Sequence, residues 1–300
     1  MVMGMIVALG WEARQLDVDM AYLEAYLEED IYVELPEAYR DSRKQVGLLK
    51  KAMYGLVHAR LLWSKPFGIE LEAKGFQRSQ ADPCVFRRIL HGIVAVVIVV
   101  YVDDLLVASA TKRDEEQAVR DLCSCFPIKD LGEAFYYLGC HITQDQNAGT
   151  LKFDQHQYIQ TMAEHFGVTK TNIIPSVAGG KALSKSDSPQ TDAEVEEMRQ
   201  IPYREIVGAL MWAATMTRPD ISFAAHHLAK FNDNSGPTHW RAAQKALEYL
   251  WCPRDLGITY GEEPGEGDQV ISVGRRRLQH LPGHASLSVG RGGDYGCRGH

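Results

Sequence analysis

Two adjacent aspartates, Asp103 and Asp104, are the residues whose types and spacing best suit chemistry. They stand between two uncharged apolar runs, residues 93–102 and 105–108, and the first of these is rich in β-branched side chains. Such runs predict buried strands, and two strands joined through Asp-Asp predict a tight hairpin with both carboxylates at its tip. Adjacent carboxylates repel each other unless a cation binds between them, so the pattern indicates a metal site. The alternative is an ordinary type I turn, in which aspartate is common.

A third carboxylate, Asp17, lies at the end of a short apolar stretch within residues 15–23. By itself, Asp17 is more typical of a helix cap or a turn. The stretch Tyr101-Val102-Asp103-Asp104, however, resembles the Tyr-x-Asp-Asp box of reverse transcriptases, in the version found in Ty1/copia-type retrotransposon polyproteins. Residues 15–23 resemble the first catalytic box of the same family, Gln-Leu-Asp-Val-x-x-Ala-Phe/Tyr-Leu. Only a folded sheet could bring these two distant boxes together.

Further segments resemble copia-type boxes, in family order, between Ile6 and Tyr260. They are residues 46–56, 79–84, 128–133, 136–140, 202–210 and 217–221. This order excludes an unrelated two-carboxylate hydrolase. The resemblance implies an α+β fold: a right-hand polymerase palm with an antiparallel sheet backed by helices, followed by a helical thumb or connection region.

The resemblance also implies roles for single residues. The catalytic residues and metal ligands would be Asp17, Asp103 and Asp104. Residues near the nucleotide would be Val18, Tyr22, His58 and Tyr101, and the primer grip would contain Tyr137, Leu138 and Gly139. The implied reaction is RNA-directed DNA polymerisation, in which two Mg²⁺ ions, or Mn²⁺ in their place, assist nucleotide transfer to a primer 3′-hydroxyl. The implied partners are an RNA or DNA template with its primer and deoxynucleoside triphosphates.

Some positions depart from the family pattern. His58 stands where glutamine is expected, the Pro-Arg pair that should follow is absent, and Pro66 interrupts a predicted helix that runs to Gly75. An interior proline costs a helix about 3 kcal/mol. Only sixteen residues precede Asp17, so we expect this chain to lack the basic fingers region. The alternative to an active polymerase is therefore a catalytically inactive retrotransposon remnant with at most weak nucleic-acid binding.

Composition sets wider bounds. The chain has 300 residues, 45% hydrophobic content and a net charge of −7, which is atypical of a free nucleic-acid binder. Its six cysteines form no zinc spacing, and the histidines at 226, 227 and 239 have no metal-ligand spacing either. The longest apolar run is too short to cross a membrane, and the start shows no secretion signal. We expect an intracellular protein, cytoplasmic (in a virus-like particle) or nuclear.

The expected organisation has three parts. Residues 1–145 would form the palm with partial fingers, and residues 146–260 a thumb- or connection-like helical region with a mobile linker at about 178–199. Residues 261–300, rich in Gly and Arg, would be an unrelated disordered tail, so RNase H and integrase would also be absent. Locally, His91-Gly92 predicts a hairpin turn, and Thr111 with Asp114 predicts a helix start.

Overall fold

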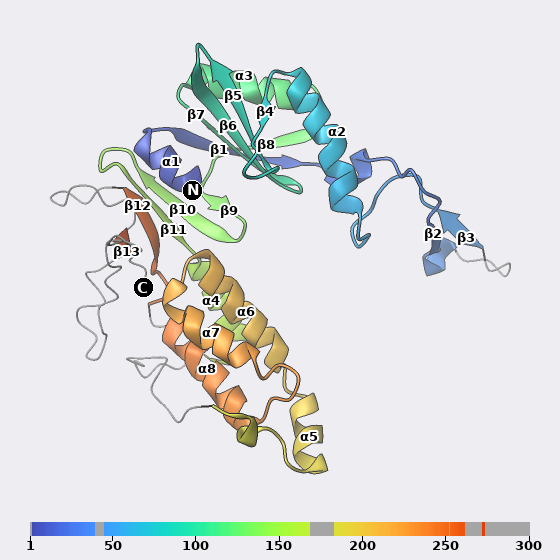
Figure 1. Ribbon diagram of the computed structural model, residues 1–300, viewed down its shortest axis with the longest axis vertical. Coiled ribbons are helices and arrows are strands. Elements are labelled where there is room, and N and C mark those ends of the chain that lie inside the picture. The colour runs from blue at the N-terminus through green and yellow to red at the C-terminus, as the bar shows by residue number, and fades with distance from the viewer. Residues whose placement is uncertain (1, 40–44, 169–182, 252, 262–271, 274–300) are drawn as a thin grey trace, which may run out of the picture. The chain divides into compact units, whose positions relative to one another are not determined.

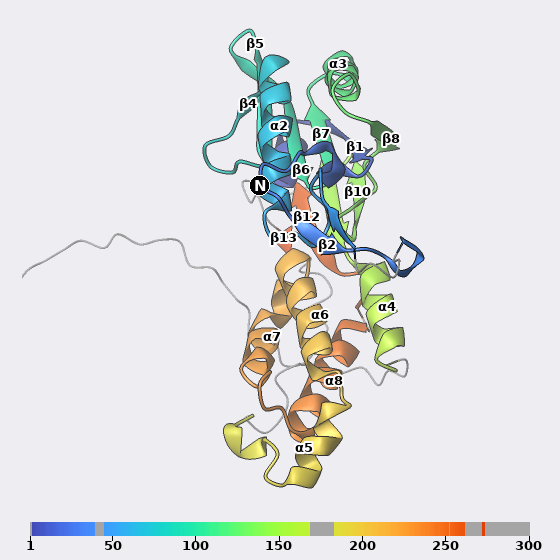
Figure 2. The same cartoon turned by 90° about the vertical axis from the view of Figure 1, so that its right-hand side faces the viewer.

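The computed structural model describes residues 2–39, 45–168, 183–251, 253–261 and 272–273 (Figures 1 and 2). The chain divides into two compact units, of which one comprises Met1–Asp154 with Thr259–Ser272 and the other Gln155–Ile258 with Val273–His300. The expected α+β class with antiparallel sheets is confirmed.

The first unit is built on a six-stranded antiparallel sheet with the order β4-β5-β6-β7-β1-β8. Its strands are β4 (Gln77–Arg78), β5 (Val85–Leu90), β6 (Ile93–Tyr101), β7 (Asp104–Ser109), β1 (Glu12–Val18) and β8 (Ile128–Glu133). The β5–β6 hairpin turns at His91-Gly92, as predicted, and both residues have positive φ, 53° and 80°. Asparagine, aspartate and glycine usually fill such turns, and the histidine accepts this conformation beside the glycine.

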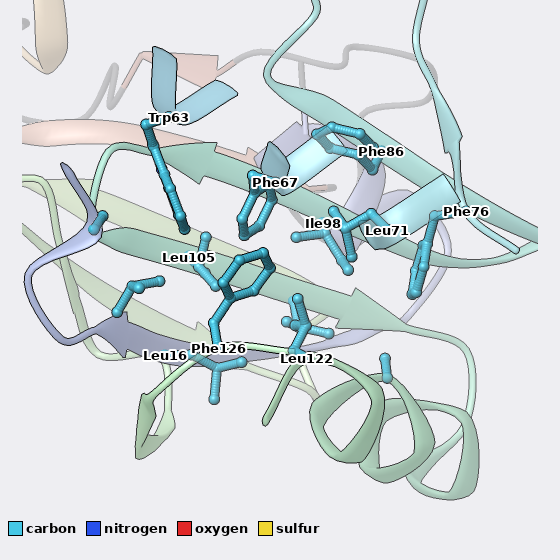
Figure 3. Close-up of a cluster of buried hydrophobic side chains, with 14 of the residues drawn as sticks. Leu16, Trp63, Phe67, Leu71, Phe76, Phe86, Ile98, Leu105, Leu122 and Phe126 are labelled. Carbon is cyan, nitrogen blue, oxygen red and sulfur yellow. The ribbon is translucent and has the colours of Figure 1, made fainter. Parts of the chain in front are cut away.

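Two helices pack on the sheet, α2 (Ala59–Ala73) and α3 (Lys112–Cys123). Figure 3 shows Trp63, Phe67 and Leu71 of α2 facing side chains of the sheet, where they form one buried cluster with the residues around Leu105 and Leu122. Burial of large apolar side chains contributes about 1.5–3 kcal/mol each, which makes this cluster the main stabilising feature of the unit.

A capping residue explains where α3 begins, and packing explains why α2 accommodates an interior proline. The Thr111 side chain accepts a hydrogen bond from the Asp114 amide at the start of α3, as the sequence predicted. Pro66 lies inside α2, which continues through it. The proline still removes one backbone donor, and the buried rings of Trp63 and Phe67 on either side supply the packing that offsets this loss.

Smaller strands form two further sheets. A five-stranded sheet has the order β13-β12-β11-β10-β9. Its strands are β9 (Tyr136–Tyr137), β10 (Cys140–Asp145), β11 (Thr150–Asp154), β12 (Gly257–Gly261) and β13 (Ser272–Val273). A separate two-stranded sheet pairs β2 (Tyr32–Glu34) with β3 (Val46–Leu48). Helix α1 (Val2–Ala8) precedes β1.

The second unit is helical. It contains α4 (His156–His165), α5 (Asp192–Arg199), α6 (Tyr203–Met216), α7 (Ser222–Ala229) and α8 (Pro237–Trp251). Helices α4, α6, α7 and α8 share one apolar core. Of the predicted linker at about 178–199, residues 178–182 lie outside the described residues, and the remainder includes α5. The predicted tail also lies outside them, apart from residues 261 and 272–273.

Residues 217–221 link several segments of the helical unit through hydrogen bonds. The buried guanidinium of Arg218 donates to both carboxylate oxygens of Asp220, at 3.0 and 2.7 Å, and to the carbonyl of Pro253 at 3.1 Å. The hydroxyl of Tyr249 on α8 donates to the same carboxylate. A buried charge needs this degree of pairing, so the box has a structural role in this chain.

Candidate active site

Strand register brings the distant aspartates together. Asp17 on β1 lies directly opposite Asp104 on β7, and Asp104 in turn lies opposite Tyr101 on β6. Directly opposite residues in antiparallel strands point to the same face, with Cβ atoms about 4.5–5.5 Å apart. The sheet therefore places these three side chains in a row, and it joins the two boxes that lie far apart in the sequence.

The prediction that both aspartates form the hairpin tip is wrong by one residue. The β6–β7 turn consists of Val102 and Asp103, and Asp104 is the first residue of β7. Val102 has a φ of 57°, which is unfavourable for a β-branched residue. Its carbonyl accepts a hydrogen bond from the Trp63 indole at 3.1 Å, and the amide of Val18 donates to the carbonyl of Asp103 at 2.8 Å. These tertiary contacts hold a turn that the local sequence would not choose.

The side chain of Asp103 is held from two segments. Its Oδ1 accepts a hydrogen bond from the Ala21 amide at 3.0 Å and another from the Tyr54 hydroxyl at 2.5 Å. Ala21 opens the short 3₁₀ helix Ala21–Glu24, and Met20 before it has a φ of 52°, so the chain turns sharply after β1. This turn points the Ala21 amide at the hairpin.

The three aspartates carry like charges that repel one another. Burial raises the pKa of Asp17, the charges of Asp103 and Asp19 raise it further, and Lys129 lowers it. Burial also raises the pKa of Asp104, as do the charges of Asp17 and Asp103. The oxygen atoms of the three carboxylates do not all lie within 4.8 Å of one another. Carboxylates that repel one another in a partly buried site suit a hard divalent cation such as Mg²⁺, which prefers oxygen ligands.

Aromatic residues border the carboxylates. The ring of Tyr22 is half-buried, and its centroid lies 4.7 Å from that of Tyr54. A cavity of about 220 Å³ adjoins the hairpin, and its walls include Tyr22, Arg60, Trp63, Cys84, Tyr101 and Val102. The guanidinium of Arg60 donates to the Cys84 sulfur at 3.5 Å. The cavity wall thus combines aromatic rings with the guanidinium of Arg60, and this combination suits a negatively charged ligand that contains a ring.

Two other predicted site residues, Val18 and His58, do not present their side chains to the three carboxylates. The Val18 side chain lies in the apolar core, and its amide donates a hydrogen bond to the carbonyl of Asp103. His58 is exposed at the N-cap of α2, and no interaction links its side chain to the carboxylates within the described residues.

The predicted primer-grip residues form a tight hairpin. Leu138 and Gly139 are its turn, with φ of 51° and 77°, and Tyr137 pairs with Cys140. Tyr137 is buried, and its hydroxyl has no hydrogen-bond partner among the described residues. Burial raises the pKa of Tyr137, and the charge of Asp104 raises it further.

Sequence reasoning missed two residues that contact the hairpin, Tyr54 and Trp63. Tyr54 belongs to the box at residues 46–56, but that resemblance assigns no role to its hydroxyl. Trp63 stands three residues before Pro66 and is an apolar residue of the kind that normally fills a core. Neither the spacing nor the type of these residues reveals the contacts, which join segments 49 and 39 positions apart.

Comparison with known proteins agrees with this geometry. Residues 1–178 match the family model for reverse transcriptase (RNA-dependent DNA polymerase). The chain is 33% identical, over 83% of its length, to the retrovirus-related Pol polyprotein from transposon TNT 1-94 of Nicotiana tabacum. It is 32% identical over 82% of its length to a transposon Ty5-1 protein of Saccharomyces cerevisiae, and 30% identical over 86% to the Pol polyprotein from transposon RE1 of Arabidopsis thaliana.

These relatives differ in how much of their length is matched. The chain spans 19% of the TNT 1-94 polyprotein, 17% of the RE1 polyprotein and 78% of the Ty5-1 protein. None of the helices in the described part of the chain has the length and apolar character that a membrane span needs. The family model covers more than half of the chain, and the first catalytic box and the Tyr-x-Asp-Asp box both lie inside it. This chain therefore belongs to the reverse transcriptase (RNA-dependent DNA polymerase) family, in the group found in Ty1/copia-type retrotransposon polyproteins.

Proposed function

We propose that this chain is an RNA-directed DNA polymerase domain that adds deoxynucleotides to a primer 3′-hydroxyl. One observation carries the proposal: the strand register sets Asp17 opposite Asp104, and the turn places Asp103 next to them. In this proposal the six-stranded sheet with α2 and α3 is the palm, with partial fingers in residues 1–145. The helical region at 146–260 is the thumb or connection.

The chain's own residues define the chemistry that the site can support. Asp17, Asp103 and Asp104 would hold two divalent ions, Mg²⁺ or Mn²⁺, which when bound activate the primer hydroxyl and neutralise charge on the triphosphate. Catalysis in such sites is mostly positioning and charge neutralisation, so the rigidity of the hairpin matters as much as its charge. The contacts of Val18 and Trp63 with the turn supply that rigidity.

The surrounding residues would orient the substrates. Tyr22 and Tyr101 offer aromatic surface for the sugar and base, and Arg60 lies beside them at the wall of the cavity. The hairpin with Leu138 and Gly139 at its turn would hold the primer, as the family resemblance implies. The resemblance implies that His58 lies near the nucleotide. The structure gives this role little support, because His58 is exposed and nothing in the described residues orients its side chain. In this proposal the reaction takes place inside the cell, as the family resemblance implies.

The test is primer extension on an RNA template with purified protein and Mg²⁺ or Mn²⁺. The Asp103→Asn, Asp104→Asn double variant should reduce extension by at least about 100-fold, because the site loses charge-stabilising ligands. Asp30→Asn, which removes an exposed carboxylate from a loop, is the matched control and should leave extension unchanged. Extension that survives in the double variant would refute the assignment of these carboxylates. No extension from folded wild-type protein would favour the catalytically inactive remnant.

A further inference from the structure

The hydroxyl of Tyr54 makes the shortest contact to the carboxylate of Asp103. Tyr54 lies in the loop between β3 and α2, and the residue is 49% exposed. Its hydroxyl donates to Oδ1 of Asp103 at 2.5 Å. Hydrogen bonds to a charged acceptor are shorter and about twice as strong as neutral ones. The contact therefore contributes to the orientation of this carboxylate.

The pattern of bonds on Asp103 is one-sided. Oδ1 accepts from both Tyr54 and the amide of Ala21, whereas no described residue donates a hydrogen bond to Oδ2. A carboxylate oxygen has two lone pairs, so two donors fill Oδ1. The remaining oxygen is the one that stays available to another ligand, and rotation of the carboxylate would break both bonds.

A single element fixes the whole arrangement. The 3₁₀ helix Ala21–Glu24 supplies the Ala21 amide and also the ring of Tyr22, which lies 4.7 Å from the ring of Tyr54 at an interplanar angle of 49°. This tilted aromatic contact holds the Tyr54 ring, and with it the hydroxyl, while leaving one edge in solvent. Both donors to Oδ1 are thus fixed by the turn that follows β1.

We propose that Tyr54 is a positioning residue that orients the Asp103 carboxylate so that Oδ2 faces a divalent cation. This inference rests on the proposed function, in which Asp103 is a metal ligand. Residues that orient metal ligands through hydrogen bonds commonly change metal affinity by 10- to 100-fold, although they never touch the metal. Loss of the single hydroxyl should therefore weaken cation binding while leaving the ring contact and the fold intact.

The experiment measures Mn²⁺ binding directly, by titrating the full chain and counting free Mn²⁺ by electron paramagnetic resonance. Tyr54→Phe removes only the hydroxyl. Tyr32→Phe makes the same change at a tyrosine that is 60% exposed, and Asp103→Asn removes the proposed ligand. We expect the Kd for Mn²⁺ to rise about 10-fold in Tyr54→Phe, to rise at least as much in Asp103→Asn, and to stay unchanged in Tyr32→Phe. Thermal melting without metal verifies that each variant is folded.

The outcomes separate the two proposals. If Asp103→Asn weakens Mn²⁺ binding and Tyr54→Phe does not, the positioning role is wrong and the proposed function stands. If Asp103→Asn binds Mn²⁺ as the wild type does, Asp103 is not a ligand and both proposals fail. An equal rise in Kd for Tyr54→Phe and Tyr32→Phe would also overturn the positioning role, since the effect would not depend on contact with Asp103.

Discussion

Replacement of Trp63 by Phe separates the support that the core gives to the hairpin from the stability of the core itself. Trp63 is 2% exposed, and its side chain packs against the rings of Phe67 and Phe126, with ring centroids 5.1 Å apart in each case. Phenylalanine keeps an aromatic ring at this position. The substitution removes the indole N–H, which donates to the carbonyl of Val102 at 3.1 Å.

The magnitude follows from two terms. Loss of one neutral hydrogen bond costs about 1 kcal/mol, and the smaller ring leaves a gap that costs about 1 kcal/mol more. We therefore expect the free energy of unfolding to fall by about 2 kcal/mol. The hydrogen-bond share acts on the turn in particular, because Val102 is held at a φ that costs about 1–2 kcal/mol. A loss of about 1 kcal/mol at the turn makes local opening about fivefold more frequent.

Amide hydrogen exchange of Val18 reads out this opening, because the Val18 amide donates to the carbonyl of Asp103 in the same turn. Urea unfolding gives the global stability. Phe67→Leu is the control, since it also shrinks a ring of the cluster without touching Val102. We expect both variants to be less stable, with about fivefold faster native-state exchange at Val18 only in Trp63→Phe. The same Val18 exchange rate in both variants would refute the conclusion that the indole supports the turn.

Two further predictions concern the helical unit. Arg218→Met should lower its free energy of unfolding by about 3 kcal/mol, measured by urea denaturation, because Asp220 loses both guanidinium bonds. Burial lowers the pKa of His239, and its Nδ1 accepts the Gly236 amide at 2.9 Å, so the folded state holds the ring neutral. Because the unfolded chain takes up the proton first, the melting temperature should fall as the pH drops below the ordinary value of 6.5 and level off below the folded-state pKa.

Matched variants test the reasons behind these two predictions. Arg241→Met removes an exposed guanidinium from α8 and should change stability by less than about 0.5 kcal/mol; a loss equal to that of Arg218→Met would refute the pairing argument. His239→Gln should flatten the pH dependence between 8 and 5, whereas His165→Gln, at an exposed end of α4, should not. An unchanged slope in His239→Gln would show that another group carries the titration.

The antiparallel α+β fold and its strands were predictable because local signals and tertiary packing favour the same structure. Residues 93–102 are apolar and β-branched, and nearly all of them form β6. The turn at His91-Gly92 and the start of α3 at Thr111 also followed from their own residues. Pro66 shows the limit of local reasoning, since packing keeps α2 continuous through a residue that lowers helix propensity.

The sequence by itself determined the family, the three candidate carboxylates and the alternation of strands and helices, because these depend on residue type and local spacing. Tertiary structure alone decided that the turn is Val102-Asp103, since a β-branched residue takes positive φ only where distant groups hold it. It also decided that Tyr54 donates to Asp103. Such contacts join segments that are distant in the chain, and they depend on strand register and helix packing, which local spacing does not encode.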